Sequence, residues 1–318
     1  MKLLNDYRLP GRSETDKDQI VDRIFDLGAV GVKMFSAQIE KQVRPQLDRY
    51  RDRFFKQALA LVASKTKSPV STKEIADLRA AVLALKEKKD LTKEEIERVG
   101  DPAMKRLSEL LVIDRKAVLQ AAPDLEKERA KLTAVGKYWE RCLVFQNGEL
   151  PEDQRAKDPP NFGKYLLGEE ELAAGMAMPI DQGARAVLTA NERLVGKIDH
   201  EEAQGILACN LTRILLGLNP CAIDLKLVEA ARGHSHDMET LKFFSHESPV
   251  AGKKTPWDRA KLAGTSASAE NIFVGNMSGK VANEAWFHSP GHHKNMLADH
   301  VRIGIGRSGN DFAEMFGN

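Results

Sequence analysis

Three short stretches near the C-terminus decide the fold, and they read Phe243-Phe244-Ser245-His246-Glu247-Ser248-Pro249, Ala269-Glu270-Asn271-Ile272 and Trp286-Phe287-His288-Ser289-Pro290-Gly291-His292-His293-Lys294-Asn295. All eight histidines of the chain lie at or after His200, so the side chains suited to site chemistry are concentrated here. Neutral imidazoles and carboxylates are ligands of zinc-like ions, and imidazole changes charge near neutral pH. The stretches therefore predict a functional site in the last third of the chain.

Upstream of the first stretch, the chain from about Asp224 has the spacing of an amphipathic helix. Its apolar line is Leu227, Ala231, His234, Met238 and Leu241, which recur at steps of four and three residues. His234 falls on the buried side of this helix, and His236 falls on the opposite side. A buried imidazole is more often a hydrogen-bonded core residue than a ligand, so His234 is a secondary site candidate.

Local signals also place the residues of the third stretch and those that follow it. Ser289-Pro290 has the form of an N-cap followed by proline at the first helical position, which places His292 in the first turn of a helix. The positive end of that helix disfavours an imidazolium, so we expect a neutral His292. After it, a strand is predicted over Val301 to Ile305, with a turn at Gly309-Asn310 and a second strand up to Phe316.

Taken in order, these motifs resemble the CAP superfamily, which includes cysteine-rich secretory proteins, insect venom antigens, plant pathogenesis-related proteins and bacterial SCP-like proteins. The matching positions within residues 183–318 are Asn210, Arg213, Gly217, Leu218, Pro220, His234 to Met238, Phe244 to His246, Ser248, Pro249, Arg259, Gly264, Glu270 to Ile272, Trp286, Ser289 to His292 and Ile303 to Gly306. The resemblance implies a CAP-type α-β-α sandwich with a small antiparallel sheet.

In many CAP proteins two histidines and two acids line a central cavity that can hold a divalent metal. By this resemblance His246 and His292 take the histidine positions and Glu270 takes the first acid position. The second acid position holds Ser289, as is typical of the bacterial SCP-like subgroup. The cavity residues are therefore expected to include His246, Glu270, His292, Ser289 and His234, with zinc or another divalent metal bound by the first three.

The N-terminal part, residues 1–160, reads as an all-α bundle and makes the whole chain α+β. Apolar residues at helical spacing run from Ile20 to Met34, and helix starts of the capping-box form are predicted at Ser71, Thr92 and Asp199. A polar, proline-rich linker is expected at about 147–160, before a CAP domain over 183–318. Residues 161–182 fit either an extension of the linker or a strap on the second domain.

Composition excludes several classes of protein. Apolar residues make up 42% and charged residues 30% of the chain, and the net charge is +2 with positive charges interspersed, so we expect no nucleic-acid partner and no membrane span. The first residues lack the apolar core of a signal peptide, so either the protein is intracellular or a signal is missing from this sequence. We expect a secreted, periplasmic or cell-surface protein. The sequence does not decide whether Cys209 and Cys221 form a disulfide.

Three functions fit these observations. The favoured one is a secreted or cell-envelope module whose cavity binds a metal and a small ligand such as a lipid, glycan or peptide. One alternative is a metal-assisted hydrolase of peptides or cell-wall polymers with Glu270 as base, although the sequence contains no recognisable nucleophile motif, which favours a non-enzymatic protein. The other alternative is a structural interaction protein in which the helical domain mediates protein binding or self-association.

Overall fold

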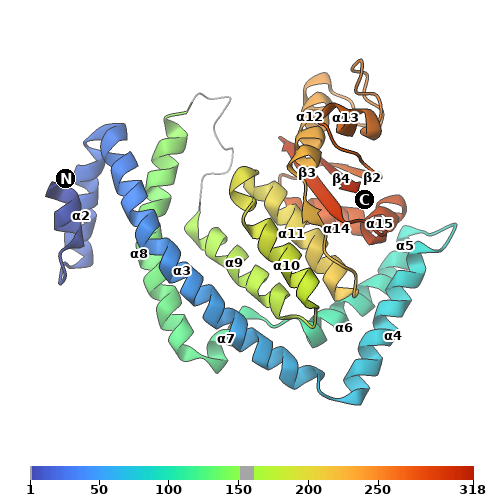
Figure 1. Cartoon of the computed structure of the whole chain (residues 1–318), viewed down its shortest axis with the longest axis horizontal. Coiled ribbons are helices and arrows are strands. Elements are labelled where there is room, and N and C mark those ends of the chain that lie inside the picture. Colours follow the sequence, from blue (N-terminus) through green and yellow to red (C-terminus); the bar gives the residue numbers. More distant parts are fainter. Residues whose placement is uncertain (1, 151–160) are drawn as a thin grey trace. The chain divides into compact units, whose positions relative to one another are not determined.

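The computed structural model describes residues 2–150 and 161–318 and has the α+β class predicted from the sequence (Figure 1). Its contacts divide the chain into two compact units. We call them the helical unit, Met1–Ala58 with Asp114–Ala174, and the mixed unit, Leu59–Ile113 with Gly175–Asn318. Residues 59–113, which we placed with the N-terminal helices, thus belong with the C-terminal domain. The expected linker at 147–160 lies, from residue 151 onward, outside the described residues.

The helical unit consists of helices that pack around a core of large apolar side chains. Its elements are α1 (Lys2–Arg8), α2 (Glu14–Phe25), most of α3 (Gly28–Thr66), α7 (Arg115–Ala121), α8 (Pro123–Gly148) and most of α9 (Phe162–Ala177). The stretch 161–182, ambiguous in the sequence, mostly forms α9. On α3 the core residues are Val32, Phe35, Ile39 and Val43, at helical spacing and fully buried.

The continuous stripe that we expected from Ile20 to Met34 is wrong, because the chain breaks within it. Helix α2 ends at Phe25, and α3 begins at Gly28, whose φ of 68° is a left-handed conformation that glycine adopts without strain. Ile20 is buried, but Met34 is 44% exposed because it belongs to the second helix. The apolar spacing alone did not indicate that the chain changes direction here.

The mixed unit contains a four-stranded sheet covered by helices. Its elements are α4 (Pro69–Lys86), α5 (Lys93–Glu95), η1 (Ile96–Gly100), α6 (Asp101–Leu111), α10 (Gln182–Glu192), η3 (Val195–Lys197), α11 (His200–Leu215), β1 (Ala222–Ile223), α12 (Leu225–Leu241), α13 (Pro256–Leu262), β2 (Ala269–Val274), α14 (Gly279–Phe287), α15 (Pro290–Leu297), β3 (Arg302–Ser308) and β4 (Asp311–Gly317). No helix among the described residues combines the length and hydropathy needed to cross a bilayer.

The strand order is β1-β3-β4-β2, and β4 pairs antiparallel with both β3 and β2. The short strand β1 pairs parallel to β3. The sheet is therefore mixed, whereas we expected an antiparallel sheet. Only two residue pairs form this parallel ladder, Ala222 with Arg302 and Ile223 with Ile303. The hairpin between β3 and β4 turns at Gly309-Asn310 as predicted, with Ser308 opposite Asp311.

Helices cover both faces of the sheet, which confirms the α-β-α sandwich (Figure 1). Helix α12 packs on one face of β3 and β4, and α11 packs on β3 from the other face. Side chains alternate along a strand, so Gly304 and Gly306 face α12 while Ile305 reaches α11 beside Gly205. A Cβ atom on Gly306 would lie 1.9 Å from the backbone nitrogen of Arg232. The missing side chain lets α12 approach the sheet closely.

Helix starts follow the local signals only in part. Thr92 caps α5 and Asp199 caps α11, the latter in a full capping box, as predicted. The predicted start at Ser71 is wrong, since α4 begins earlier, at Pro69. There the hydroxyl of Ser68 accepts the hydrogen bond from the backbone N–H of Ser71 at 3.1 Å, so the upstream serine is the cap.

Residues 59–113 are joined to the CAP-like part of the mixed unit through polar contacts, and we call them the helical arm. The guanidinium of Arg79 donates to the carbonyls of Ile214 and Leu215 at 3.2 and 2.8 Å. These are carbonyls of the last turn of α11, which have no partner within their own helix. At another point His288 Nε2 lies 2.8 Å from the carboxylate of Asp101. The arm therefore contacts helices on the side of the sheet that carries α15.

Candidate functional site

Glu270 lies at the centre of the candidate site, on the edge strand β2, and its side chain is buried. One carboxylate oxygen accepts a hydrogen bond from His246 Nδ1 at 2.9 Å, and the other accepts from Arg259 Nη2 at 2.6 Å. Arg259 is itself only 3% exposed. A buried carboxylate needs such a charged partner because the protein interior solvates it poorly. His246 and Arg259 together thus hold both oxygens of Glu270 in place.

His246 lies in the loop after α12, and its ring is about half exposed, with 48% of the side chain accessible. The chain enters this loop through Lys242, which has a left-handed φ of 56°. Because Nδ1 carries the proton donated to Glu270, the neutral ring presents Nε2 as a free lone pair. The backbone oxygen of His246 accepts from Arg259 at 3.1 Å, so one guanidinium positions both the carboxylate and the loop.

His292 faces His246 from the first turn of α15, and the two ring centroids lie 6.1 Å apart. Burial lowers the pKa of His292, and the charge of His246 lowers it further. Burial and the neighbouring imidazole thus favour the neutral ring that we expected from the sequence. The ring makes no hydrogen bond to the part of the chain that the structure describes. Both imidazoles are therefore available to a ligand.

His234 and Ser289, the other two residues that we assigned to the cavity, differ from this pair. His234 is fully buried on α12, and its Nε2 donates to the carbonyl of Ser245 at 3.0 Å, which anchors the loop that carries His246. Burial lowers the pKa of His234. Ser289 occupies the N-cap position of α15 with proline following, but its side chain makes no capping hydrogen bond. We find no contact among described residues that joins Ser289 to Glu270.

The metal site predicted from the sequence uses three ligands, His246, Glu270 and His292. No group of three or more His, Cys, Asp or Glu side chains in residues 2–150 and 161–318 is arranged to hold a metal ion. Metal binding by His246, Glu270 and His292 together stays a prediction; in this structure the two oxygens of Glu270 accept hydrogen bonds from His246 and Arg259. The donor chemistry fits a site of two imidazoles, in which the carboxylate behind one ring fixes its tautomer and orientation.

Three further residues support the site without having been assigned a role from the sequence. Besides Arg259, Asn295 on α15 donates to the backbone oxygen of Glu270 at 3.1 Å and to the side-chain oxygen of Asn271 at 2.9 Å. These bonds tie the helix of His292 to the edge strand of Glu270. All three residues stand within or beside the quoted motifs, but nothing in their spacing indicates which groups they bind.

From the sequence alone we expect His293 and His300 to lie on the surface, but both are buried. The expectation was wrong because each ring has aromatic and polar partners from distant parts of the sequence or the neighbouring helix. His293 Nδ1 donates to the carbonyl of Phe287 at 2.7 Å. The ring of His300 stacks on that of Phe316, with centroids 4.7 Å apart.

Beneath α15 lies Glu314, which is fully buried and bonded to Asn271 Nδ2 at 2.7 Å. Burial raises the pKa of Glu314 to about 7, although bonds from Asn271 and the Cys209 thiol oppose the shift. All three cysteines, Cys209 and Cys221 included, are buried free thiols in the structure. Glu314 thus carries a buried carboxyl group that loses its proton near neutral pH.

Glu314→Gln should stabilise the protein more at pH 8 than at pH 5. The ordinary pKa of a glutamate side chain, which applies in the unfolded chain, is 4.5. Between pH 4.5 and about pH 7 the folded protein therefore keeps a proton on Glu314 that the unfolded chain has lost. The free energy of unfolding of the natural protein therefore falls as pH rises through this window, whereas glutamine does not titrate. We expect the difference between variant and natural protein to grow by roughly 2–3 kcal/mol over this range. Urea unfolding at several pH values measures it, and a difference independent of pH would contradict the assignment.

Comparisons with known proteins support the family resemblance of the C-terminal part of the chain. The family model of CAP, the cysteine-rich secretory protein family, matches residues 207–314. Among curated proteins, the chain is 36% identical over 112 residues to the uncharacterized protein YkwD and 32% identical over 106 residues to the uncharacterized membrane protein YlbC, both of Bacillus subtilis (strain 168). The two alignments cover 34% and 33% of this chain but only 43% and 31% of those proteins, so less than half of each relative is matched.

Two solved structures are also similar. An extracellular protein containing an SCP domain from Bacillus anthracis str. Ames has 29% identity and a TM-score of 0.35, covering 37% of this chain and 40% of that one. An outer surface protein from Borrelia burgdorferi has 23% identity and a TM-score of 0.32, covering 38% and 96%. On the family match and its ordered motifs, residues 207–314 form a domain of the CAP, cysteine-rich secretory protein family.

Proposed function

We propose that the CAP domain is the binding module of a secreted or cell-envelope protein, in which His246 and His292 hold a divalent metal such as zinc beside a small ligand. The observation that carries the proposal is the pair of imidazoles facing each other at 6.1 Å, one of them with its tautomer set by Glu270. Bound zinc would supply a Lewis acid with positions open to an oxygen of the ligand.

The chain contributes orientation more than catalysis at this site. Glu270 holds the His246 ring with Nε2 free, and Arg259 holds Glu270 in turn. The low pKa of His292 keeps its nitrogen unprotonated at neutral pH, which leaves the lone pair for coordination. Aromatic surface lies close in sequence, since Phe244 is 52% and Trp257 58% exposed. These side chains suit the apolar or sugar face of a lipid, glycan or peptide.

Hydrolysis with Glu270 as base finds no such support. A general base must lie within reach of the attacking group, and the Glu270 side chain is only 1% exposed, with each oxygen hydrogen-bonded to the chain. We therefore favour binding over turnover for this site.

Zinc titrated into the full chain at pH 7.5 should bind at about one ion per chain by isothermal calorimetry. His246→Ala and His292→Ala should each weaken the affinity by at least about tenfold, because either change removes one of two imidazole donors. His236→Ala is the matched control, since that ring is exposed on the outer side of α12 and should not affect binding. Equal affinity in the natural protein and both site variants would refute the metal site.

A further inference from the structure

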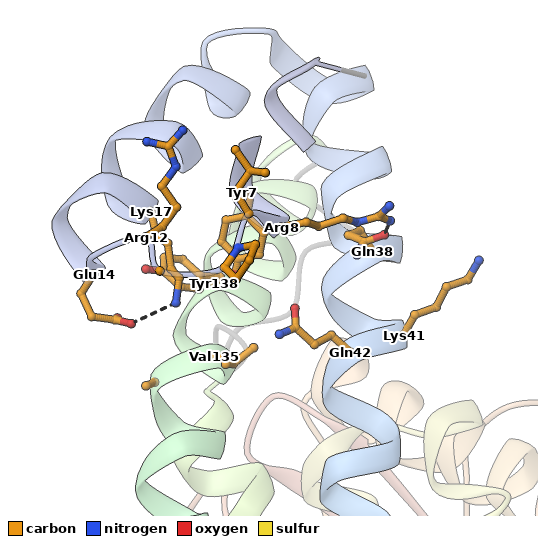
Figure 2. A pocket seen from close by; sticks show the side chains of 14 residues that line it. Tyr7, Arg8, Arg12, Glu14, Lys17, Gln38, Lys41, Gln42, Val135 and Tyr138 are labelled. Atoms are coloured by element: carbon orange, nitrogen blue, oxygen red, sulfur yellow. Dashed lines mark hydrogen bonds and ion pairs between the residues drawn. The ribbon is translucent and has the colours of Figure 1, made fainter. Parts of the chain in front are cut away.

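The helical unit contains a pocket that shares no residue with the CAP-domain site, and its volume is about 400 Å³ (Figure 2). It is formed by α1, the turn after it, the start of α2, the first half of α3 and a segment of α8. Its lining residues include Tyr7, Arg8, Arg12, Gln38, Gln42 and Tyr138. Pockets that take small molecules usually have volumes of roughly 300–1,000 Å³. The size therefore suits a small organic molecule.

Two tyrosine rings form an apolar wall of the pocket. Tyr7 and Tyr138 pack edge to face with centroids 5.7 Å apart, and Figure 2 shows them at the centre of the pocket, above Val135. Burial raises the pKa of both phenols, so both stay neutral. The Tyr138 hydroxyl is buried and makes no hydrogen bond of good geometry to the described chain. The Asp18 carboxylate nevertheless lies near this hydroxyl, which lowers the pKa of Asp18. The two rings therefore give the pocket an aromatic wall.

The rim of the pocket is positively charged. Four basic side chains line it, Arg8, Arg12, Lys17 and Lys41, against the single acid Glu14. Glu14 is already neutralised by Lys17 at 3.5 Å, a pair drawn in Figure 2, and by Lys137 at 3.3 Å outside the pocket.

The remaining three cations of the rim have no acidic partner within ion-pair distance in the described chain. Arg8 instead donates to the side-chain oxygen of Gln38, as Figure 2 shows. Gly11, with a φ of 82°, turns the chain between α1 and α2, and this turn places Arg8 and Arg12 on the same rim. The uncompensated charge creates a positive potential over the aromatic wall.

We propose that this pocket binds a small anion with a flat apolar body, such as an aromatic phosphate ester or carboxylate. Guanidinium groups match the oxygens of phosphate and carboxylate with paired hydrogen bonds, which the exposed Arg8 and Arg12 supply from the rim. The rings of Tyr7 and Tyr138 pack against the apolar body, and the amide of Gln42 offers a further polar contact.

The probe for this site is 1-naphthyl phosphate, titrated into the full chain at low salt and followed by its fluorescence. We expect saturable binding of one molecule per chain. Neutral 1-naphthol and inorganic phosphate, each lacking half of the required chemistry, should bind at least about tenfold more weakly. The double variant R8Q/R12Q should lose at least about tenfold in affinity, whereas K33Q, the same charge change at an exposed position of α3 outside the pocket, should not.

Several outcomes would overturn the proposal: no saturable binding, 1-naphthol binding as tightly as its phosphate ester, or unchanged affinity in R8Q/R12Q. Should circular dichroism show that the double variant is unfolded, salt replaces it as the measurement on the natural protein. Raising salt screens exposed charges, so affinity for 1-naphthyl phosphate must fall severalfold between about 50 and 300 mM salt. Affinity independent of salt would then refute an anion site.

Discussion

Arg259→Ala is expected to lower the free energy of unfolding by about 3–5 kcal/mol, because it leaves the buried carboxylate of Glu270 without its guanidinium. The side chains of both residues are at most 2% exposed, so water cannot replace the lost partner. The guanidinium also bonds the backbone oxygen of His246, and the loop that carries this histidine should loosen with it. Urea unfolding monitored by tryptophan fluorescence measures the change.

A matched control for this variant lies on the same loop. Lys254 pairs with Glu247 at 3.6 Å, but both side chains are about two-thirds exposed. Exposed ion pairs contribute roughly 0–1 kcal/mol, so Lys254→Ala should cost little. Similar losses in both variants would show that Arg259 does not stabilise a buried charge. A double variant, Arg259→Met with Glu270→Gln, should be destabilised less than Arg259→Ala since it removes the unpaired charge.

Gly306→Ala is expected to destabilise the mixed unit by about 2–3 kcal/mol or more, since the added methyl group meets backbone and not a movable side chain. Its Cβ would lie 1.9 Å from the nitrogen and 2.5 Å from the Cα of Arg232, so α12 must shift away from the sheet. That shift also moves His234 and the loop it anchors. Thermal unfolding of the full chain, followed by near-ultraviolet circular dichroism, measures both effects.

The same helix supplies a control of opposite sign. Gly233 follows Arg232 in the middle of α12, and a Cβ there would meet nothing within 4 Å. Glycine costs roughly 0.5–1 kcal/mol relative to alanine inside a helix, so Gly233→Ala should stabilise the protein by about that amount. If Gly306→Ala were as harmless as Gly233→Ala, the close approach of α12 to β3 would be disproved.

Much of the CAP domain follows from signals that act over a few residues. The apolar line of α12, the Asp199 cap of α11 and the Gly309-Asn310 turn all appear where the sequence predicts them. Within this apolar line only Leu241, the last residue of α12, is not buried, since it is 54% exposed. Helix period, capping and turn formation depend on near neighbours, and for that reason a single sequence suffices to predict them.

The sequence by itself determined the α+β class and the positions of the site motifs. The family resemblance of these motifs also indicated that His246 and Glu270 lie close together. Only the tertiary structure decided that Arg259 engages Glu270, that residues 59–113 pack with the CAP domain, and that Arg8 and Arg12 share a pocket with Tyr138. The physical reason is that partners distant in sequence meet only after the chain has closed, and their pairing depends on burial and charge that no local spacing encodes.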